Sequence, residues 1–325
     1  MRVELESARR KAERELMKLP FVHGIATTND REAIVVFVES EEQAQMIPLE
    51  YAGFPVEVFV TGKIEALSLV APLVKRTERF RPAPGGVSIG HYTITAGTLG
   101  SRVYDSRTGA RLILSNNHVL AATNRGEPGD PILQPGPYDG GTMKDMIARL
   151  LRFVRLLPPP TYNRVDCAVA MPIMNAYLSD EILGIGVVNE ENFNPEVGMT
   201  VFKSGRTTGV TSGKITYTNA TVKVWYGGGR YYIFGDQIVT TFMARGGDSG
   251  SLLVDEDHRA VGLLFAGSSR VTVHNRIEYV CRELGVTFSR MKVRPPKIKK
   301  EYLIAAGAFI ASTALTYYIA RRWLR

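Results

Sequence analysis

Apolar and polar residues follow two different patterns along the chain, and the first covers residues 1–72. The charged N-terminal stretch has apolar residues at helical spacing, namely Val3, Leu5, Ala8, Ala12 and Leu16. This spacing predicts a short amphipathic helix. Apolar stretches at 21–26, 33–39 and 54–60 predict strands, and Ser40 followed by acidic residues predicts a short helix over 40–46. This order of elements indicates a small α/β domain.

The second pattern, over residues 88–289, consists of short β-rich stretches separated by Gly and Asn turns. The predicted strands cover residues 92–96, 111–114, 165–171, 199–203, 213–217, 222–226, 231–234, 237–241, 251–254, 260–265 and 271–274. Many short strands with frequent turns predict a mainly β fold, either a barrel or a sandwich. The Pro-rich residues 73–87 between the two patterns predict a linker or an ordered crossing segment.

One stretch, residues 142–157, interrupts the β pattern with a helical period. Arg149, Arg152 and Arg155 recur every third residue beside an apolar stripe, and a run of prolines follows. This predicts an amphipathic helix that packs on its own domain. The alternative is a basic helix that lies on a membrane surface.

The positive charge of the chain is confined to its C-terminal end. The 325 residues have a formal net charge of +8, and 45% of them are hydrophobic, which is enough for a substantial core. Residues 290–325 contain nine Lys or Arg and one acidic residue, so this end alone has a charge of +8. The first 289 residues have 31 basic and 31 acidic residues. A basic surface for nucleic acid is therefore not predicted.

Residues 302–320 form an uncharged run of 19 residues. As a helix, this run would extend roughly 28 Å, close to the thickness of the hydrocarbon core of a bilayer. Tyr302 at one end and Tyr317 and Trp323 at the other fit the aromatic residues found at membrane interfaces. We predict a transmembrane helix that contacts membrane lipid, preceded by a basic juxtamembrane linker over 290–301. The alternative is a buried core helix.

The N-terminal sequence has neither the apolar region nor the cleavage site of a secretory signal. Together with the basic residues 290–300, this predicts a single-pass C-terminal anchor with the preceding domain on the cytoplasmic side of the membrane. The basic residues that follow the apolar run favour the opposite orientation.

The two cysteines, Cys167 and Cys281, lie in apolar surroundings. Buried free thiols are predicted for them in preference to a disulfide. No closely spaced His, Cys, Asp or Glu residues suggest a metal site, so neither a metal nor a cofactor is predicted.

The residues around Ser249 have the strongest chemical signature in the chain. They read Gly246-Gly247-Asp248-Ser249-Gly250-Ser251 and lie between two strand-like stretches. Glycines permit a tight turn that exposes a serine and lets backbone N–H groups converge on one point. This composition predicts a nucleophilic serine, whereas the alternative is an ordinary hairpin turn.

A nucleophilic serine needs a base and an orienting acid, and few residues in this chain qualify. Among the five histidines, only His118 follows an apolar strand-like stretch that ends in polar residues. Asp166 is the carboxylate inside an apolar strand-like run, where it is costly unless it is hydrogen-bonded. His118 and Asp166 are therefore the predicted partners of Ser249.

Residues 203–209, KSGRTTG, form a Gly- and Thr-rich loop with two basic residues. Such a loop can bind a phosphate. It lacks the spacing of a P-loop and no helical pattern follows it, so a hairpin turn is favoured.

The order of His118, Asp166 and Ser249, with the phrases LSNNHVL, VDCAVA and GGDSGSLLV, resembles the trypsin-like serine peptidases with the chymotrypsin fold. RPAPGGVSIGH and KSGRTTG resemble a prokaryotic and plant branch of that family, which often has an N-terminal α/β extension. The resemblance covers roughly residues 80–285. It implies two six-stranded antiparallel β-barrels with the three residues in the cleft between them.

The resemblance also implies roles for individual residues. His118 would be the general base and then acid, Asp166 would orient it, and Ser249 would attack. The backbone N–H groups of Gly247 and Ser249 would form the oxyanion hole. The strand with Phe265, Ala266 and Gly267 would pair with the substrate, and Phe265 stands where the family usually has Ser. Met243 and Ala244 lie near the primary specificity pocket, where the absence of an acid favours a small or apolar substrate side chain.

The predicted function is that of a membrane-anchored serine endopeptidase that acts on protein or peptide substrates through an acyl-enzyme. One alternative is a catalytically silent module that binds peptides in the same cleft or organises a membrane complex. Another is a protease restricted to self-processing, with residues 73–87 or 290–300 as its target.

Overall fold

The N-terminal residues form the helices and strands that their sequence predicts. In the computed structural model, which describes residues 2–28, 31–66 and 75–290, these elements are α1 (Arg2–Leu16), β1 (Val22–Thr27), β2 (Ile34–Val38), α2 (Glu41–Ala44), β3 (Glu50–Tyr51) and β4 (Phe54–Val60). The Ser40 amide donates to Gln43 Oε1 at 3.1 Å and so caps the first turn of α2. Leu5, Ala12 and Leu16 of α1 are buried against the sheet.

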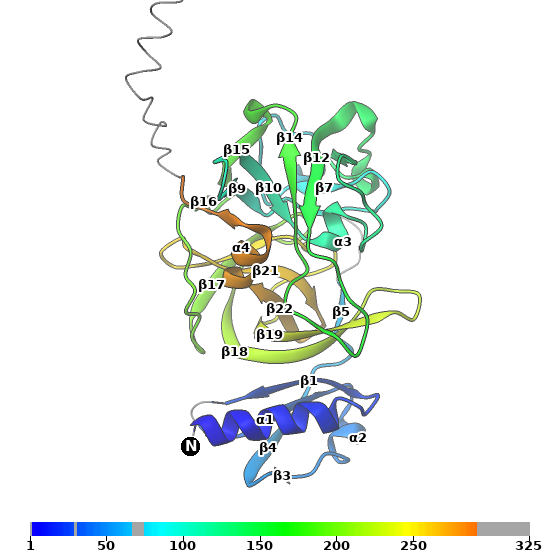
Figure 1. The fold of residues 1–325 in the computed structure, drawn as a ribbon, viewed down its shortest axis with the longest axis vertical. Helices are drawn as coiled ribbons and strands as arrows, with labels where there is room; N and C mark the ends of the chain where they lie inside the picture. Colours follow the sequence, from blue (N-terminus) through cyan, green and yellow to red (C-terminus); the bar gives the residue numbers. More distant parts are fainter. Residues whose placement is uncertain (1, 29–30, 67–74, 291–325) are drawn as a thin grey trace, which may run out of the picture. The chain divides into compact units, whose positions relative to one another are not determined.

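Six strands in the C-terminal half close into a ring (Figure 1). They are β17 (Thr200–Gly205), β18 (Gly209–Trp225), β19 (Tyr231–Thr241), β20 (Leu252–Asp255), β21 (Ala260–Gly267) and β22 (Val271–Arg276). Antiparallel pairing runs in the order β17, β18, β19, β22, β21, β20 and returns to β17. The predicted strands 213–217 and 222–226 are two parts of the single strand β18. The helix α4 (Ile277–Leu284) follows the ring.

Seven strands that precede this ring, together with one that follows α4, form a separate eight-stranded sheet. Its order is β23 (Val286–Thr287), β9 (Ser101–Asp105), β10 (Arg111–Ser115), β14 (Ala168–Pro172), β12 (Met146–Phe153), β11 (Pro131–Leu133), β7 (Ser88–His91) and β8 (Gly97–Thr98). The one-turn helix α3 (Asn117–Leu120) follows β10. The fold is therefore mainly β with few helices, as the sequence predicts, but the sheet before the ring has eight strands in place of the six-stranded barrel that the resemblance implies.

Short elements connect these parts. They are β5 (Glu65–Ala66), β6 (Ala83–Gly85), β13 (Tyr162–Asn163), β15 (Leu178–Ile182), β16 (Gly186–Val187) and the 3-10 turns Lys75–Thr77, Pro137–Asp139, Met143–Asp145 and Asn175–Tyr177. Arg76 donates to Ser204 Oγ at 2.7 Å, and β6 pairs with β15. Residues 75–87 are thus an ordered crossing segment. Strand β1 pairs with β18, so the N-terminal strands extend the sheet of the C-terminal ring.

The helix predicted over residues 142–157 is wrong. Residues 143–145 form a single 3-10 turn, and Met146–Phe153 is strand β12, which pairs with β11 and β14 on its two sides. A β-bulge between Leu150 and Arg152 breaks strict alternation, so the strand lacks the two-residue period that would reveal it. Pairing on both edges outweighs the local helical pattern.

The strand predicted over residues 92–96 is also wrong, because His91 ends β7 and the chain then turns. The amide of Ile94 donates to the His91 carbonyl at 3.1 Å and closes this turn.

The predicted membrane-spanning segment 302–320 lies outside the described residues and stays a prediction. Within residues 2–28, 31–66 and 75–290, no helix is long and apolar enough to cross a bilayer.

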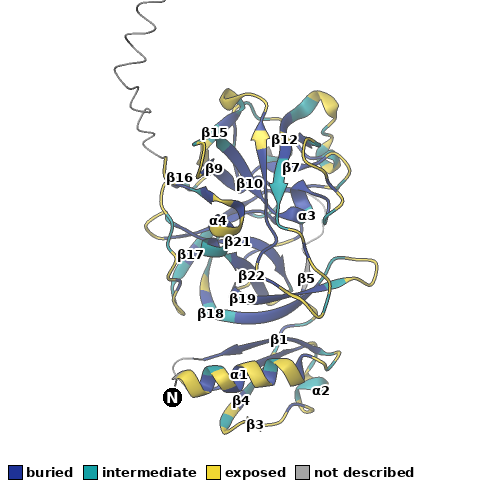
Figure 2. Ribbon diagram, in the orientation of Figure 1, coloured by how far each residue is buried: buried dark blue, intermediate teal, exposed yellow. Residues whose placement is uncertain are grey.

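Buried residues, dark blue in Figure 2, fill the strands of both large sheets, whereas α1 turns an exposed face outward. One apolar cluster contains residues of both sheets, among them Leu112, Val169 and Leu263, together with Val280 of α4. Cys167 and Cys281 belong to the same cluster and are free, as predicted. This shared core fixes the two sheets relative to each other and so positions the residues discussed next.

Candidate active site

His118 lies in α3, directly after strand β10. Its side chain is 14% exposed, and its Nδ1 lies 2.6 Å from Oδ2 of Asp166. The backbone N–H of His118 donates to Oδ1 of the same carboxylate at 3.1 Å. The carboxylate therefore holds both the ring and the backbone of His118, which fixes the direction of Nε2.

Asp166 is fully buried just before strand β14, and several groups fix it. Its backbone N–H donates to Asn275 Oδ1 at 2.9 Å, and its carbonyl accepts from Asn116 Nδ2 at 2.7 Å. Oδ2 also accepts the hydroxyl hydrogen of Tyr226 at 2.6 Å. Both oxygens of this buried carboxylate therefore have hydrogen-bond partners.

Ser249 lies in the turn between β19 and β20 and is 1% exposed. Gly247 has a φ of 92°, which a residue with a side chain adopts only under strain. The Asp248 amide donates back to the Arg245 carbonyl at 3.0 Å, and the Gly250 amide donates to the Leu264 carbonyl at 2.8 Å. Within the described residues, no hydrogen bond from the Gly247 or Ser249 amide is found. These two amides are therefore available to a ligand.

Strand β8 contacts both the backbone of Ser249 and the residue that follows His118. The Thr98 amide donates to the Ser249 carbonyl at 2.8 Å, and Thr98 Oγ1 donates to the Gly247 carbonyl at 2.8 Å. A Cβ atom on Gly97 would lie 2.5 Å from Cγ2 of Val119 and 3.0 Å from the Ser249 carbonyl oxygen. The residue next to His118 and the backbone of Ser249 therefore meet at Gly97.

The two atoms that would exchange a proton in catalysis are both buried. Among the described residues, neither Nε2 of His118 nor Oγ of Ser249 has a hydrogen-bond partner. Buried polar atoms without partners are uncommon and occur at catalytic sites. Each has its hydrogen-bonding capacity free for the other or for a substrate.

The loop 203–209 is the hairpin turn between β17 and β18, as predicted, and it binds an anion of the chain itself. The amides of Thr207 and Thr208 donate to Oδ1 of Asp248 at 2.8 and 3.1 Å. Lys203 Nζ lies 3.3 Å from Oδ2 of Asp248, and both side chains are fully buried. Burial lowers the pKa of Lys203, and the charge of Asp248 opposes that shift. The hairpin thus fixes the residue before Ser249.

The residues predicted to bind substrate differ in their accessibility. Met243 and Ala244 are buried, and the ring of Phe265 packs 4.6 Å from the ring of Phe234 inside the C-terminal ring of strands. Ala266 and Gly267 lie at the end of β21, where they pair antiparallel with Ala66 and Glu65 of β5. The strand predicted to receive a peptide is therefore paired with a segment of the same chain.

Two of the other histidines, His91 and His274, have local partners. His91 Nε2 lies 2.9 Å from Asp130, and His274 is fully buried with Nε2 3.0 Å from Thr240 Oγ1. Burial lowers the pKa of His274 to about 3, so this ring is neutral near pH 7. No group of three or more His, Cys, Asp or Glu in the described ranges is arranged to hold a metal ion.

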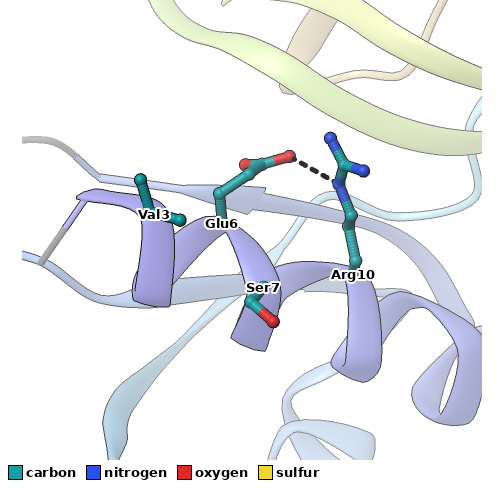
Figure 3. A pocket seen from close by; sticks show the side chains of 4 residues that line it. All are labelled: Val3, Glu6, Ser7 and Arg10. Atoms are coloured by element: carbon teal, nitrogen blue, oxygen red, sulfur yellow. Dashed lines mark hydrogen bonds and ion pairs between the residues drawn. The ribbon is translucent and has the colours of Figure 1, made fainter.

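A surface pocket of about 470 Å³ lies on helix α1 (Figure 3). Val3, Glu6, Ser7 and Arg10 line it, and Arg10 Nε donates to Glu6 Oε1 at 3.3 Å. None of the predicted catalytic residues contributes to it.

Three further residues belong to this site and were not predicted from the sequence: Tyr226, Asn275 and Lys203. Tyr226 and Asn275 are more than 50 residues from Asp166 in sequence, at separations of 60 and 109. Only strand pairing brings them to the carboxylate. Lys203 had a detectable signal, because a lysine in an apolar stretch beside a Gly-rich loop needs a buried anion.

Comparison with known proteins adds sequence relatives. The chain is 42% identical over 94 residues to serine protease 2 of Streptomyces fradiae, a match that covers 29% of this chain and 45% of that protein. It is 42% identical over 82 residues to glutamyl endopeptidase 2 of Streptomyces griseus, covering 25% and 35%. The chain thus spans less than half the length of these curated relatives. No family model matches it.

Solved structures with a similar backbone arrangement include a Nocardiopsis protease and protease A of Thermobifida fusca. The first has 18% identity and a TM-score of 0.47, and the match covers 63% of this chain and 97% of that structure. The second has 16% identity and a TM-score of 0.48, with 64% and 98% covered. In sequence, the chain is thus similar to two Streptomyces peptidases over less than a third of its length, and its own fold is mainly β.

Proposed function

We propose that this protein is a serine endopeptidase that hydrolyses peptide bonds through an acyl-enzyme. The observation that supports it best is the His118–Asp166 pair, whose Nδ1 and Oδ2 lie 2.6 Å apart. The two curated relatives are named as a serine protease and a glutamyl endopeptidase, and both names support hydrolysis of peptide bonds.

In this mechanism Nε2 of His118 takes the proton of the Ser249 hydroxyl as Oγ attacks the substrate carbonyl. Asp166 keeps the imidazole in the tautomer with the proton on Nδ1 and stabilises the imidazolium that forms. The free amides of Gly247 and Ser249 donate to the oxyanion of the tetrahedral intermediate. His118 then passes its proton to the leaving amine, and water completes the hydrolysis by the same route.

A fluorophosphonate probe tests this proposal directly, because it reacts with serines that a neighbouring base activates. We expect the wild-type protein to be labelled and Ser249→Ala to remain unlabelled. Ser251→Ala is a suitable control, since Ser251 Oγ donates to the Asp248 carbonyl at 2.6 Å and has no base beside it. Equal labelling of wild type and Ser249→Ala would refute the proposal.

The pairing of β5 with β21 affects how a peptide substrate would bind. A peptide that adds to β21 as an antiparallel strand needs the backbone groups of Ala266 and Gly267. In the structure β5 pairs with them, and Ile64 beside β5 is fully buried in the cluster that contains Phe265. Substrate binding therefore competes with β5 for this edge.

Weakening the attachment of β5 should favour the substrate in this competition. We expect Ile64→Ala to lower KM for a peptide substrate several-fold with little change in kcat, since a buried Ile→Ala change costs about 2–5 kcal/mol of local packing. Val35→Ala is the matched control, because Val35 is buried in the same cluster but lies on β2. An unchanged or higher KM in Ile64→Ala would show that β5 does not limit access.

The substrate side chain and the cellular site extend this proposal. Met243 and Ala244 favour a small or apolar residue before the scissile bond. The predicted anchor 302–320 would attach the enzyme to a membrane, with its catalytic part on the cytoplasmic side. Flotation of the full chain with lipid vesicles tests the attachment, and protease protection of the vesicles tests the orientation.

A further inference from the structure

Tyr226 contacts the same carboxylate oxygen as the imidazole of His118. It directly follows β18, and its amide donates to the Arg230 carbonyl at 3.0 Å to close the turn between β18 and β19. Its hydroxyl donates to Oδ2 of Asp166 at 2.6 Å, the distance that also separates Nδ1 of His118 from that atom. Oδ2 therefore has two short contacts with donors, whereas Oδ1 accepts the His118 backbone amide.

The ring of Tyr226 is held by aromatic neighbours from the C-terminal ring of strands. It stands edge-on to Tyr232 with centroids 5.2 Å apart and stacks near Phe234 at 6.3 Å. It also meets the His118 ring edge-on at 5.6 Å. Burial, with the charge of Asp166 adding to it, raises the pKa of Tyr226 well above its usual range, so the hydroxyl keeps its proton.

Phe265, another aromatic side chain of the same apolar cluster, offers Asp166 no alternative hydrogen-bond donor. Phe265 is fully buried and packs on Phe234, and it has no polar side-chain atom. Tyr226, which follows strand β18 of the C-terminal ring, thus donates its hydroxyl hydrogen to Asp166, which precedes strand β14 of the eight-stranded sheet. Together with the hydrogen bond from the Asp166 amide to Asn275 Oδ1, this contact links the two halves of the site.

We propose that Tyr226 is a positioning residue for the Asp166–His118 pair, which it orients and whose basicity it limits through its hydrogen bond to Oδ2. The proposal rests on the serine peptidase function proposed above. The hydrogen bond from Tyr226 withdraws negative charge from the Asp166 carboxylate. The carboxylate therefore stabilises the His118 imidazolium less than it would without this donor. The hydrogen bond also leaves Oδ2 a single orientation in which to accept from Nδ1.

Tyr226→Phe removes the hydroxyl and keeps the ring, so it tests this role with little disturbance of packing. We expect kcat to fall about tenfold with KM nearly unchanged, the size expected for one hydrogen bond to a charged group. We also expect the pKa of His118 to rise, which moves the acid limb of the kcat/KM profile to higher pH. Asp166 and Tyr226 are the titratable groups that face the His118 ring in the described residues.

Tyr232→Phe is the matched control, because it also removes a hydroxyl from the same cluster, and among the described residues no hydrogen bond joins Tyr232 to Asp166. It should keep the wild-type acid limb and kcat. A Tyr226→Phe enzyme with the wild-type acid limb and kcat would overturn the proposal, as would an equal shift in Tyr232→Phe.

A second measurement separates this proposal from the proposed function. The His118 ring can be titrated by NMR in a Ser249→Ala background, where no turnover is needed. A higher His118 pKa on adding Tyr226→Phe supports the positioning role even if the wild-type protein hydrolyses no peptide. If Tyr226→Phe leaves the His118 pKa unchanged in this background, the positioning role is overturned. The proposed function still stands in that case, provided that the wild-type protein hydrolyses peptides.

Discussion

Ser249→Ala and His118→Ala are each expected to lower kcat for peptide hydrolysis by about 10⁶-fold, and the double variant by no more than either single change. The two side chains act as one unit, since the hydroxyl is a poor nucleophile until the imidazole takes its proton. Their reacting atoms, Oγ of Ser249 and Nε2 of His118, are buried and have no other partner in the described part of the chain.

Steady-state kinetics on a fluorogenic peptide checks this prediction, with active-site titration to count competent enzyme. His258→Ala is the control, because His258 lies in the turn after β20 with no resolved role in the site. It should keep wild-type kcat. Losses in the two single variants that add in the double variant would mean that Ser249 and His118 act independently, which contradicts the mechanism.

Lys203→Met is expected to lower both stability and activity. It removes the cation from a fully buried ion pair with Nζ 3.3 Å from Asp248, and leaves a buried carboxylate without its counter-charge. Breaking such a pair costs about 3–5 kcal/mol, which for a chain of this size corresponds to a fall in Tm of roughly 10 °C. Methionine fills a similar volume, so the loss is electrostatic in origin.

The effect on activity follows from what Asp248 holds. Oδ2 accepts the Arg245 amide at 2.9 Å and Oδ1 accepts the Thr207 amide at 2.8 Å, so this carboxylate fixes the turn on which the Gly247 and Ser249 amides lie. We expect kcat to fall about 10²–10³-fold, the cost of losing one oxyanion donor.

The double variant Lys203→Met/Asp248→Asn separates the two effects. Without either charge, the double variant should regain part of the lost Tm, as thermal unfolding would measure, yet its kcat should stay low because an amide cannot accept all the hydrogen bonds of the carboxylate. A Lys203→Met protein that unfolds at the wild-type temperature would contradict the view that this pair is structurally required.

Much of the fold follows from the sequence because its signals are local. Helix α1 has apolar residues on one face, and α2 begins at a capping residue, so neither depends on distant partners. Strand β12 shows the limit of such signals. Its bulge hides the two-residue period, and only pairing with β11 and β14 makes it a strand.

The candidate site divides in the same way. The sequence by itself determined which residues could serve as nucleophile, base and acid, because Ser249, His118 and Asp166 each stand in a local setting that little else explains. The tertiary structure alone decided what surrounds them. Tyr226, Asn275 and Lys203 reach the site through strand pairing across long stretches of sequence, and β5 reaches the end of β21 from the N-terminal residues. The physical reason is that a hydrogen bond to a buried carboxylate or a free strand edge depends on distance in space, which residue order does not specify.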